Sequence, residues 1–141
     1  MKLLKKDTDY AVRALMEAAL AGKDKHISSS LIAKKQNIPL RFLRRILSKL
    51  ISAKYLKAKE GVGGGVTLNK DSRKIKMLSL IKLFQGKIEL SECMFRKQIC
   101  QNRKTCPLRA RILKIEDKML RDFEKISIQN LLDDTKKGRK K

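Results

Sequence analysis

The chain has 141 residues, a length typical of one compact domain, and its 42% apolar residues exclude a disordered segment. Lys and Arg number 36 against 14 acidic residues, which gives a formal net charge of +22. This excess favours a polyanionic partner, and nucleic acid is the usual one, because binding releases counterions from the phosphates. A lysine-rich solvated surface is the simpler alternative. No apolar run is long enough for a membrane span, and charges interrupt the N-terminal segment, so we expect a cytoplasmic protein without membrane contacts.

The first third of the chain predicts two short helices. Apolar spacing over residues 8–21 indicates an amphipathic helix, for which Thr8 or Asp7 can serve as the N-cap. Three serines at 28–30 then offer an N-cap for a second helix over residues 31–36. An asparagine ends this second helix, and the proline that follows suits the first turn of a third helix.

The third helix carries the clearest pattern in the sequence. Its predicted buried face, at the spacing of one side of a helix, consists of Leu43, Ile46, Leu47, Leu50 and Ile51. The opposite side gathers Arg41, Arg44, Arg45 and Ser48. Two short helices joined by a tight turn, the second with a basic face, indicate a helix-turn-helix. We expect these arginines to bond to guanine O6 and N7 in the major groove or to hold phosphates.

A glycine-rich hairpin follows the third helix. Residues 54–59 and 66–68 can form two short strands around a tip that contains four glycines between residues 61 and 65. A hairpin directly after a recognition helix predicts the wing of a winged helix. The residues of this wing that we expect to lie at DNA are Lys57, Lys59, Gly63 and Gly64.

The second half of the chain predicts two more helices. One spans residues 75–85, and Pro107 begins another that we expect to run unbroken to about residue 132. Its apolar stripe has no evident cover within one small domain, so we expect it to pair with its counterpart in a homodimer. The expected organisation is mainly α, with a winged-helix region at 1–72, a connecting helix and cysteine loop at 73–106, a dimerisation helix at 107–132 and a basic tail at 133–141. We expect the end of this tail, residues 136–141, to be mobile.

The three cysteines fall within one window of 14 residues, as Cys93, Cys100 and Cys106. Their odd number argues against a disulfide framework, and their spacing lacks the C-x2-C pair of structural zinc sites. Basic residues crowd the window, and Cys106 precedes Pro107 at a helix start, where free backbone N–H groups favour a thiolate or an anionic cluster. We therefore expect functional cysteines rather than inert buried thiols.

Three thiolates leave the fourth position of an iron–sulfur cluster open. The candidate ligands are His26, Asp7, Asp9, Glu89 and Glu92. His26 is more simply explained as an exposed polar residue in a turn. Asp9 can equally cap the first helix or pair with Arg13 four residues later.

These elements, in this order, resemble the Rrf-two-type (Rrf2) winged-helix regulators over residues 1–132. The segments that carry the resemblance are TDYAVRAL at 8–15, IPLRFL at 38–43, GVGGG at 61–65 and the three-cysteine loop. The resemblance implies a homodimer with a long dimerising helix and a cluster held by three cysteines near the recognition helix. It further implies a response to nitric oxide, oxygen, redox state or iron supply.

The resemblance also implies a ligand set, and two departures refine it. In the nitric-oxide-sensitive branch an acidic residue of the partner subunit's first helix is the fourth ligand, and Asp9 matches this position. Arg109 stands where another branch has a histidine ligand. This favours carboxylate ligation, or a labile site with an exchangeable fourth position, and a [4Fe-4S] over a [2Fe-2S] cluster. Glu60 and Gly61 stand where the family's wing often begins with Arg-Gly, so we do not expect minor-groove reading by residue 60.

The sequence therefore predicts a cluster-dependent transcriptional regulator, a repressor that binds a double-stranded DNA operator. One alternative is a winged-helix regulator without a cluster, in which the cysteines act as a thiol or zinc switch. The other is a basic RNA-associated protein. A single histidine, with no nucleophile–base pairing and no phosphate-binding glycine motif, argues against an enzyme.

Overall fold

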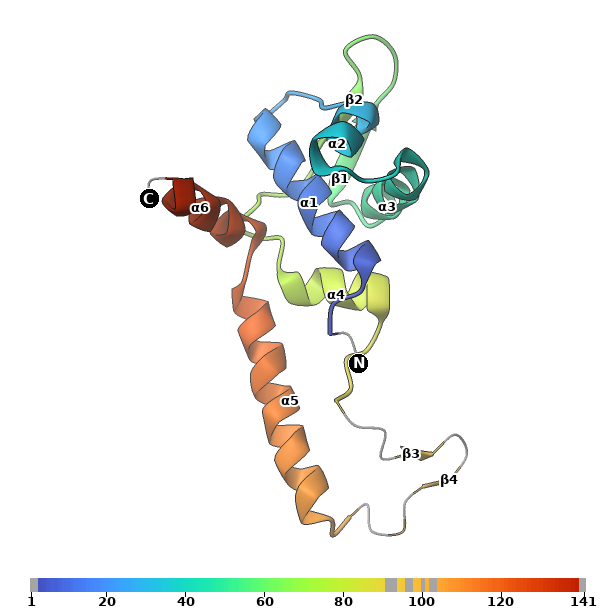
Figure 1. The fold of residues 1–141 in the computed structure, drawn as a ribbon, viewed down its shortest axis with the longest axis vertical. Coiled ribbons are helices and arrows are strands. Elements are labelled where there is room, and N and C mark those ends of the chain that lie inside the picture. The colour runs from blue at the N-terminus through green and yellow to red at the C-terminus, as the bar shows by residue number, and fades with distance from the viewer. Residues whose placement is uncertain (1–2, 91–93, 96–97, 100, 102–103, 140–141) are drawn as a thin grey trace.

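A computed structural model of the chain describes residues 3–90, 94–95, 98–99, 101 and 104–139 (Figure 1). A winged-helix body is built from α1 (Lys6–Ala21), α2 (Ser29–Gln36), α3 (Leu40–Ser52), β1 (Leu56–Lys59), β2 (Gly65–Leu68), α4 (Met77–Gln85) and α6 (Ile128–Arg139). Helix α5 (Pro107–Lys125) projects away from this body (Figure 1). The mainly helical fold predicted from the sequence is confirmed.

Helix α1 lies at the centre of the body and begins earlier than predicted. Its N-cap position is Lys5, which makes no side-chain capping bond, so the prediction that Thr8 or Asp7 caps the helix is wrong. Thr8 is instead fully buried. The alanines on the inner side of α1 are buried too, and their small size allows α3 and α4 to pack closely against the helix.

The helix-turn-helix forms as the sequence predicts. The Ser28 hydroxyl accepts a hydrogen bond from the backbone N–H of Leu31 at 3.2 Å and caps α2. Asn37 ends α2 in the left-handed conformation, with φ of 53°, a conformation that asparagine tolerates better than most residues. Pro39 lies just before α3 rather than in its first turn.

The wing is an antiparallel hairpin in which Leu56 of β1 faces Leu68 of β2. Ile27, in the loop before α2, adds a bridge to this hairpin through two backbone hydrogen bonds with Val66, of 2.9 and 2.8 Å. Gly65 makes that bridge possible, because its φ is +141° and a Cβ at this position would collide with the carbonyl group of Ile27. The wing is thus fixed at its base to the helix-turn-helix.

The predicted unbroken helix over residues 107–132 is wrong: α5 ends at Lys125 and a new helix begins at Ile128. Between them the backbone is extended and pairs with the segment before α4. The backbone N–H of Met77 donates to the Ile126 carbonyl at 2.8 Å, and the N–H of Ile128 donates to the Ile75 carbonyl at 3.0 Å. We call this pairing, residues 75–77 with 126–128, the joint.

Helix α6 returns the chain to the body after the joint. Ser127 and Asn130 cap its start reciprocally, since each side chain accepts a hydrogen bond from the other residue's backbone N–H, at 3.1 and 2.8 Å. Ile128 and Leu132 are then buried in the core next to α1. The described part of the predicted basic tail, from residue 133 to Arg139, is helical and continues α6.

The predicted cysteine loop contains a short antiparallel hairpin, in which β3 (Met94–Phe95) pairs with β4 (Gln98–Ile99). None of the helices in the described part of the chain has both the length and the apolarity needed to cross a bilayer.

Candidate DNA-binding surface and cysteine site

Helix α3 presents the predicted basic side to solvent. Its buried side consists of Leu43, Ile46, Leu47 and Leu50. Its exposed side includes all four residues predicted from it to contact DNA: Arg41, Arg44, Arg45 and Ser48. The structure thus brings these residues onto one accessible surface, while their contacts with DNA stay a prediction.

The three arginines of α3 have different surroundings. The guanidinium groups of Arg41 and Arg45 lie over the Phe42 ring, 5.2 and 5.4 Å from its centroid. Arg45 also donates from Nη2 to both carboxylate oxygens of Asp7, at 3.3 and 3.4 Å. Among the described residues, Arg44 has no such partner. Sequence reasoning treated Asp7 as a cap or a ligand and missed its contact with the recognition helix.

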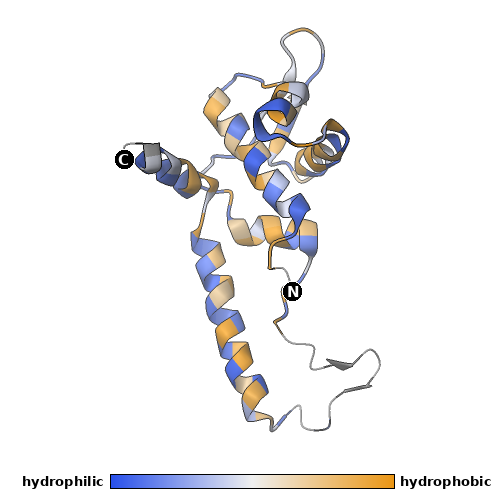
Figure 2. Cartoon of the chain, viewed as in Figure 1, coloured by the Kyte–Doolittle hydropathy of each residue, from blue (hydrophilic) through white to orange (hydrophobic). Residues whose placement is uncertain are grey.

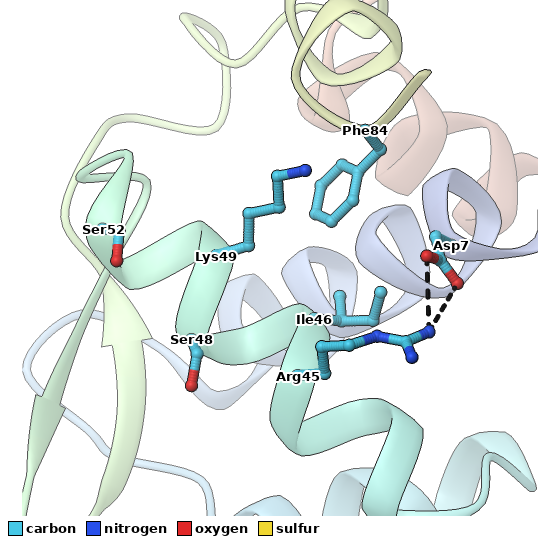
Figure 3. A pocket seen from close by; sticks show the side chains of 7 residues that line it. All are labelled: Asp7, Arg45, Ile46, Ser48, Lys49, Ser52 and Phe84. Carbon is cyan, nitrogen blue, oxygen red and sulfur yellow. Dashed lines mark hydrogen bonds and ion pairs between the residues drawn. The ribbon is translucent and has the colours of Figure 1, made fainter. Parts of the chain in front are cut away.

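A surface hollow lies on the α1 and α4 side of the recognition helix (Figure 3). It is lined by Asp7, Arg45, Ile46, Ser48, Lys49, Ser52 and Phe84. Figure 3 shows the Asp7–Arg45 pair at one side of this hollow and Lys49 extended toward Phe84 on α4. The ammonium group of Lys49 lies 5.2 Å from the centre of the Phe84 ring. Two cations on this side of α3 are therefore tethered to neighbouring elements.

The wing carries the predicted lysines on its outer surface. Lys57 and Lys59 are exposed along β1, and Gly63 and Gly64 form the tip beside a fully exposed Val62. Gly63 has φ of +75°, which favours glycine at the turn. Lys70, which sequence reasoning did not select, lies just after β2 with its ammonium group 4.5 Å from the centre of the Tyr55 ring.

Gln85, the last residue of α4, holds the N-terminal segment in place. Its Oε1 accepts hydrogen bonds from the backbone N–H of Lys5 at 2.9 Å and from the Thr8 hydroxyl at 2.6 Å. Its Nε2 donates to the carbonyl of Leu3 at 3.0 Å. Both ends of one amide therefore fix the first turn of α1, which carries Asp7 and Asp9.

Cys106 is the one predicted cysteine ligand within the described residues. It is half-buried at the N-cap of α5, and its Sγ accepts a hydrogen bond from the backbone N–H of Arg109 at 3.5 Å. The sulfur thus satisfies one of the N–H groups that a helix leaves without a partner in its first turn. Cys93 and Cys100 lie outside the described residues. Within the described part of the chain, no three potential metal ligands cluster together.

The candidates for a fourth ligand occupy different places. The Asp9 carboxylate pairs with Nε of Arg13 at 3.1 Å, both side chains being about half exposed, at 47% and 46%. Asp9 lies on α1, well away from the Cys106 end of α5 in the same chain (Figure 1). His26 lines a separate hollow beside the wing tip. Glu89 pairs with Lys87 at 3.1 Å, and Glu92 lies outside the described residues.

Helix α5 has no buried residue within the chain although it carries a recurrent apolar stripe, visible in Figure 2. Leu108 and Ile115 are 65% and 61% exposed. Nearer the joint, Met119, Phe123 and Ile126 line a shallow hollow with Ile115. An apolar stripe of this kind, exposed on a single chain, is typical of a surface that another protein covers.

A model of the Rrf2 family, described as an iron-dependent transcriptional regulator, matches residues 4–134. The chain belongs to the Rrf2 family. The transcriptional regulator IscR of Photorhabdus laumondii is 26% identical to this Rrf2 protein over 123 residues, which span 87% of the chain and 74% of that relative. These comparisons identify a DNA-binding transcriptional regulator, and they confirm the prediction that the chain is not an enzyme.

Two solved structures share the fold. IscR of T. potens superimposes with a TM-score of 0.75 and 19% identity, over 96% of this chain and 88% of that one. CymR of B. subtilis, described as the global cysteine regulator, superimposes with a TM-score of 0.72 and 18% identity, over 93% of this chain and 96% of that one. At these identities the likeness establishes the winged-helix fold.

Proposed function

We propose that this Rrf2 protein is a cytoplasmic, homodimeric repressor whose affinity for a DNA operator depends on an iron–sulfur cluster. The observation that carries the proposal is the position of Cys106, a thiol held at the N-terminus of the projecting helix α5. The family's description as iron-dependent supports it. The division of the chain into a winged-helix region, a cysteine segment and a dimerisation helix follows from the same proposal.

Cys106, the predicted cysteine ligand that the structure describes, suits a cluster at the α5 end. Its half-buried sulfur accepts a backbone hydrogen bond, an interaction that also tunes the thiolates of iron–sulfur clusters. Cys93 and Cys100 would supply the second and third thiolates, and Asp9 of the partner subunit would supply the fourth ligand of a [4Fe-4S] cluster. Such a cluster would provide iron that changes oxidation state and reacts with nitric oxide or oxygen.

The homodimer is supported by the exposed stripe of α5. Two copies of a helix of 19 residues with a stripe of this spacing can bury it against each other. A second copy is also needed for the proposed Asp9 ligand, because α1 lies well away from the Cys106 end of α5 in the same chain (Figure 1).

The chain itself supplies a route from the cysteine site to the DNA-binding surface. Cys106 begins α5, and the other end of α5 is hydrogen-bonded to the segment before α4 at the joint. A change in how α5 is held at its cysteine end therefore moves the body relative to its partner. The spacing of two recognition helices decides the fit to a two-fold operator, so this movement changes affinity.

Anoxic purification tests the proposal. We expect a brown protein with visible absorption, iron and acid-labile sulfide, and we expect Cys93→Ser, Cys100→Ser and Cys106→Ser each to abolish the colour. The matched control is Thr105→Ser, a conservative change in the same segment that leaves all three thiols. Binding to an operator selected from random duplexes is then compared at fixed salt, with and without exposure to nitric oxide.

A colourless, iron-free protein that still binds the operator contradicts the cluster proposal. That result favours the second candidate, a regulator without a cluster in which the cysteines form a thiol or zinc switch. The free, only partly buried thiol of Cys106 and the likeness in fold to CymR support this candidate. Metal analysis and mass spectrometry of the oxidised protein separate zinc from a disulfide. An RNA-associated role receives no support from the family match.

A further inference from the structure

We propose that Asp7 is a specificity-determining positioning residue, which holds Arg45 of the recognition helix in the orientation that reads one guanine per half-site. The inference rests on the proposed insertion of α3 into the major groove. It assigns to Asp7 a role that is independent of the cysteine site.

The contact with Asp7 leaves one donor edge of the guanidinium free. Only Nη2 of Arg45 bonds to Asp7, at 3.3 and 3.4 Å to its two oxygens. Nη2 carries two N–H groups, of which one is parallel to the N–H of Nε and the other to an N–H of Nη1. When one Nη2 hydrogen points at the carboxylate, the other still forms a parallel pair with its neighbour, since no described residue engages Nε or Nη1. Such a pair matches O6 and N7 of guanine. The carboxylate thus occupies one edge of the guanidinium while another edge can face a base.

Phe42 and Asp7 restrict the side chain of Arg45, and Gln85 in turn holds Asp7. The Phe42 ring lies beneath the guanidinium at 5.4 Å, and Asp7 fixes the end of the group. Asp7 is itself held, because Gln85 binds the backbone of Lys5 and the hydroxyl of Thr8 on either side of it. Figure 3 shows Asp7 reaching from α1 to Arg45 across the edge of the hollow.

The strength of the Asp7–Arg45 ion pair decides whether Asp7 orients Arg45 for DNA or keeps it away from DNA. The side chains are 62% and 43% exposed, and ion pairs at such sites shift an equilibrium by about fivefold or less. This is too weak to keep Arg45 from DNA, where phosphates compete for it. It is enough to bias the side chain toward one rotamer, and a fixed orientation matters for reading a base, not for attracting phosphates.

The test is a comparison of base preferences at fixed salt. Duplexes are selected from random sequence with the wild-type protein, and each base is then placed at every position of the selected half-site. Arg45→Lys keeps the positive charge but loses the pair of parallel N–H donors, so the base position at which its preference falls is the one that Arg45 reads. We expect Asp7→Asn to reduce the preference for guanine at that same position by about 3- to 5-fold.

Two further variants sharpen the result. Asp7→Glu keeps the carboxylate and is expected to restore part of the preference. The double variant Asp7→Asn with Arg45→Lys is expected to lose no more preference than Arg45→Lys alone, because Asp7 acts through Arg45. The matched control is Asp117→Asn, which removes an exposed acid paired with Arg121 on α5. Thermal unfolding confirms that each variant is folded.

Three results would overturn the inference. Asp7→Asn could tighten binding to all duplexes equally, as removal of any acid near DNA would, or alter a different position, or alter nothing. A wild-type protein without base preference would overturn both this inference and the proposed operator binding. Absence of a cluster, measured by iron content and absorption in the same preparations, would overturn the sensor proposal alone.

Discussion

In the winged-helix body, α1, α3, α4 and α6 converge on one core, and large residues such as Leu50, Leu80 and Ile128 are fully buried. Helix α5, the longest helix in the described part of the chain, has no buried residue, although its apolar residues recur at helical spacing. An amphipathic pattern therefore predicts that a face will be covered, and it does not reveal whether the cover is in the same chain. In the body the cover is internal, whereas α5 has no buried residue within the chain, and the proposed homodimer would supply its cover.

The largest expected effect separates the two regions by stability. Leu50→Ala in the body should lower the free energy of unfolding by about 2–5 kcal/mol, because it leaves a cavity in a fully buried site. Leu108→Ala on α5 should change it by about 0.5 kcal/mol or less, since Leu108 is 65% exposed. Urea denaturation measures both variants. If both variants lost the same free energy of unfolding at low protein concentration, α5 would be packed within the chain as the body is, and the contrast between the two regions would be wrong.

The second effect concerns assembly. Ile115→Asp places a charge in the exposed stripe of α5 and should weaken self-association about tenfold or more, with little change in the secondary structure of the body. Analytical ultracentrifugation over a concentration series measures it. Ala110→Asp, on the opposite side of the same helix, is the control and should leave association unchanged. If Ile115→Asp associates like the wild type, α5 is not the covered surface.

The joint between the two regions gives a smaller effect. Ser127 is 4% exposed, and its hydroxyl accepts the backbone N–H of Asn130 at the start of α6. Ser127→Ala should therefore lower the free energy of unfolding by about 1 kcal/mol, the usual loss for a removed N-cap. Ser48→Ala, at an exposed helical position without a capping bond, should not destabilise the protein. Thermal unfolding that ranks these variants in the reverse order would contradict this role of Ser127.

The smallest effect is electrostatic and local to α5. A hydrogen bond and the charge of Lys118 lower the pKa of Asp122 below its ordinary value of 3.8. The pair, at 2.9 Å, therefore favours the folded helix above the ordinary pKa, and this contribution is lost as the pH falls through the lowered pKa. In an NMR titration, Lys118→Gln should return the pKa of Asp122 toward 3.8. An unchanged titration would show that other charges hold it.

Much of the body could be predicted from the sequence, because local signals agreed with the tertiary structure. The serine N-cap of α2, the apolar face of α3 and the glycine tip of the wing each specify a conformation over a few residues. The break at Ile126 was missed because the apolar period continues across it. The sequence did contain a signal there, since Ser127 and Asn130 have the spacing of a reciprocal cap.

The candidate site was less predictable for a different reason. The exposed arginines of α3 followed from helical spacing, but the Asp7–Arg45 contact joins residues 38 positions apart and depends on how α1 crosses α3. No spacing rule finds such a pair. Likewise, the helical period could not show that Gln85 ties the start of α1 to the end of α4. Local patterns predict which residues are exposed, whereas contacts between helices decide what each of them can do.

The return of α6 to the body has a consequence for how the protein is made. Ile128 and Leu132 complete a core whose other buried residues all precede Leu83. The ribosome must therefore synthesise the cysteine segment and α5 before that core can close. A nascent chain stalled at residue 125 would carry an incomplete body that is open to proteolysis. Translation order therefore delays closure of the winged-helix body until the cysteine segment and α5 have been synthesised.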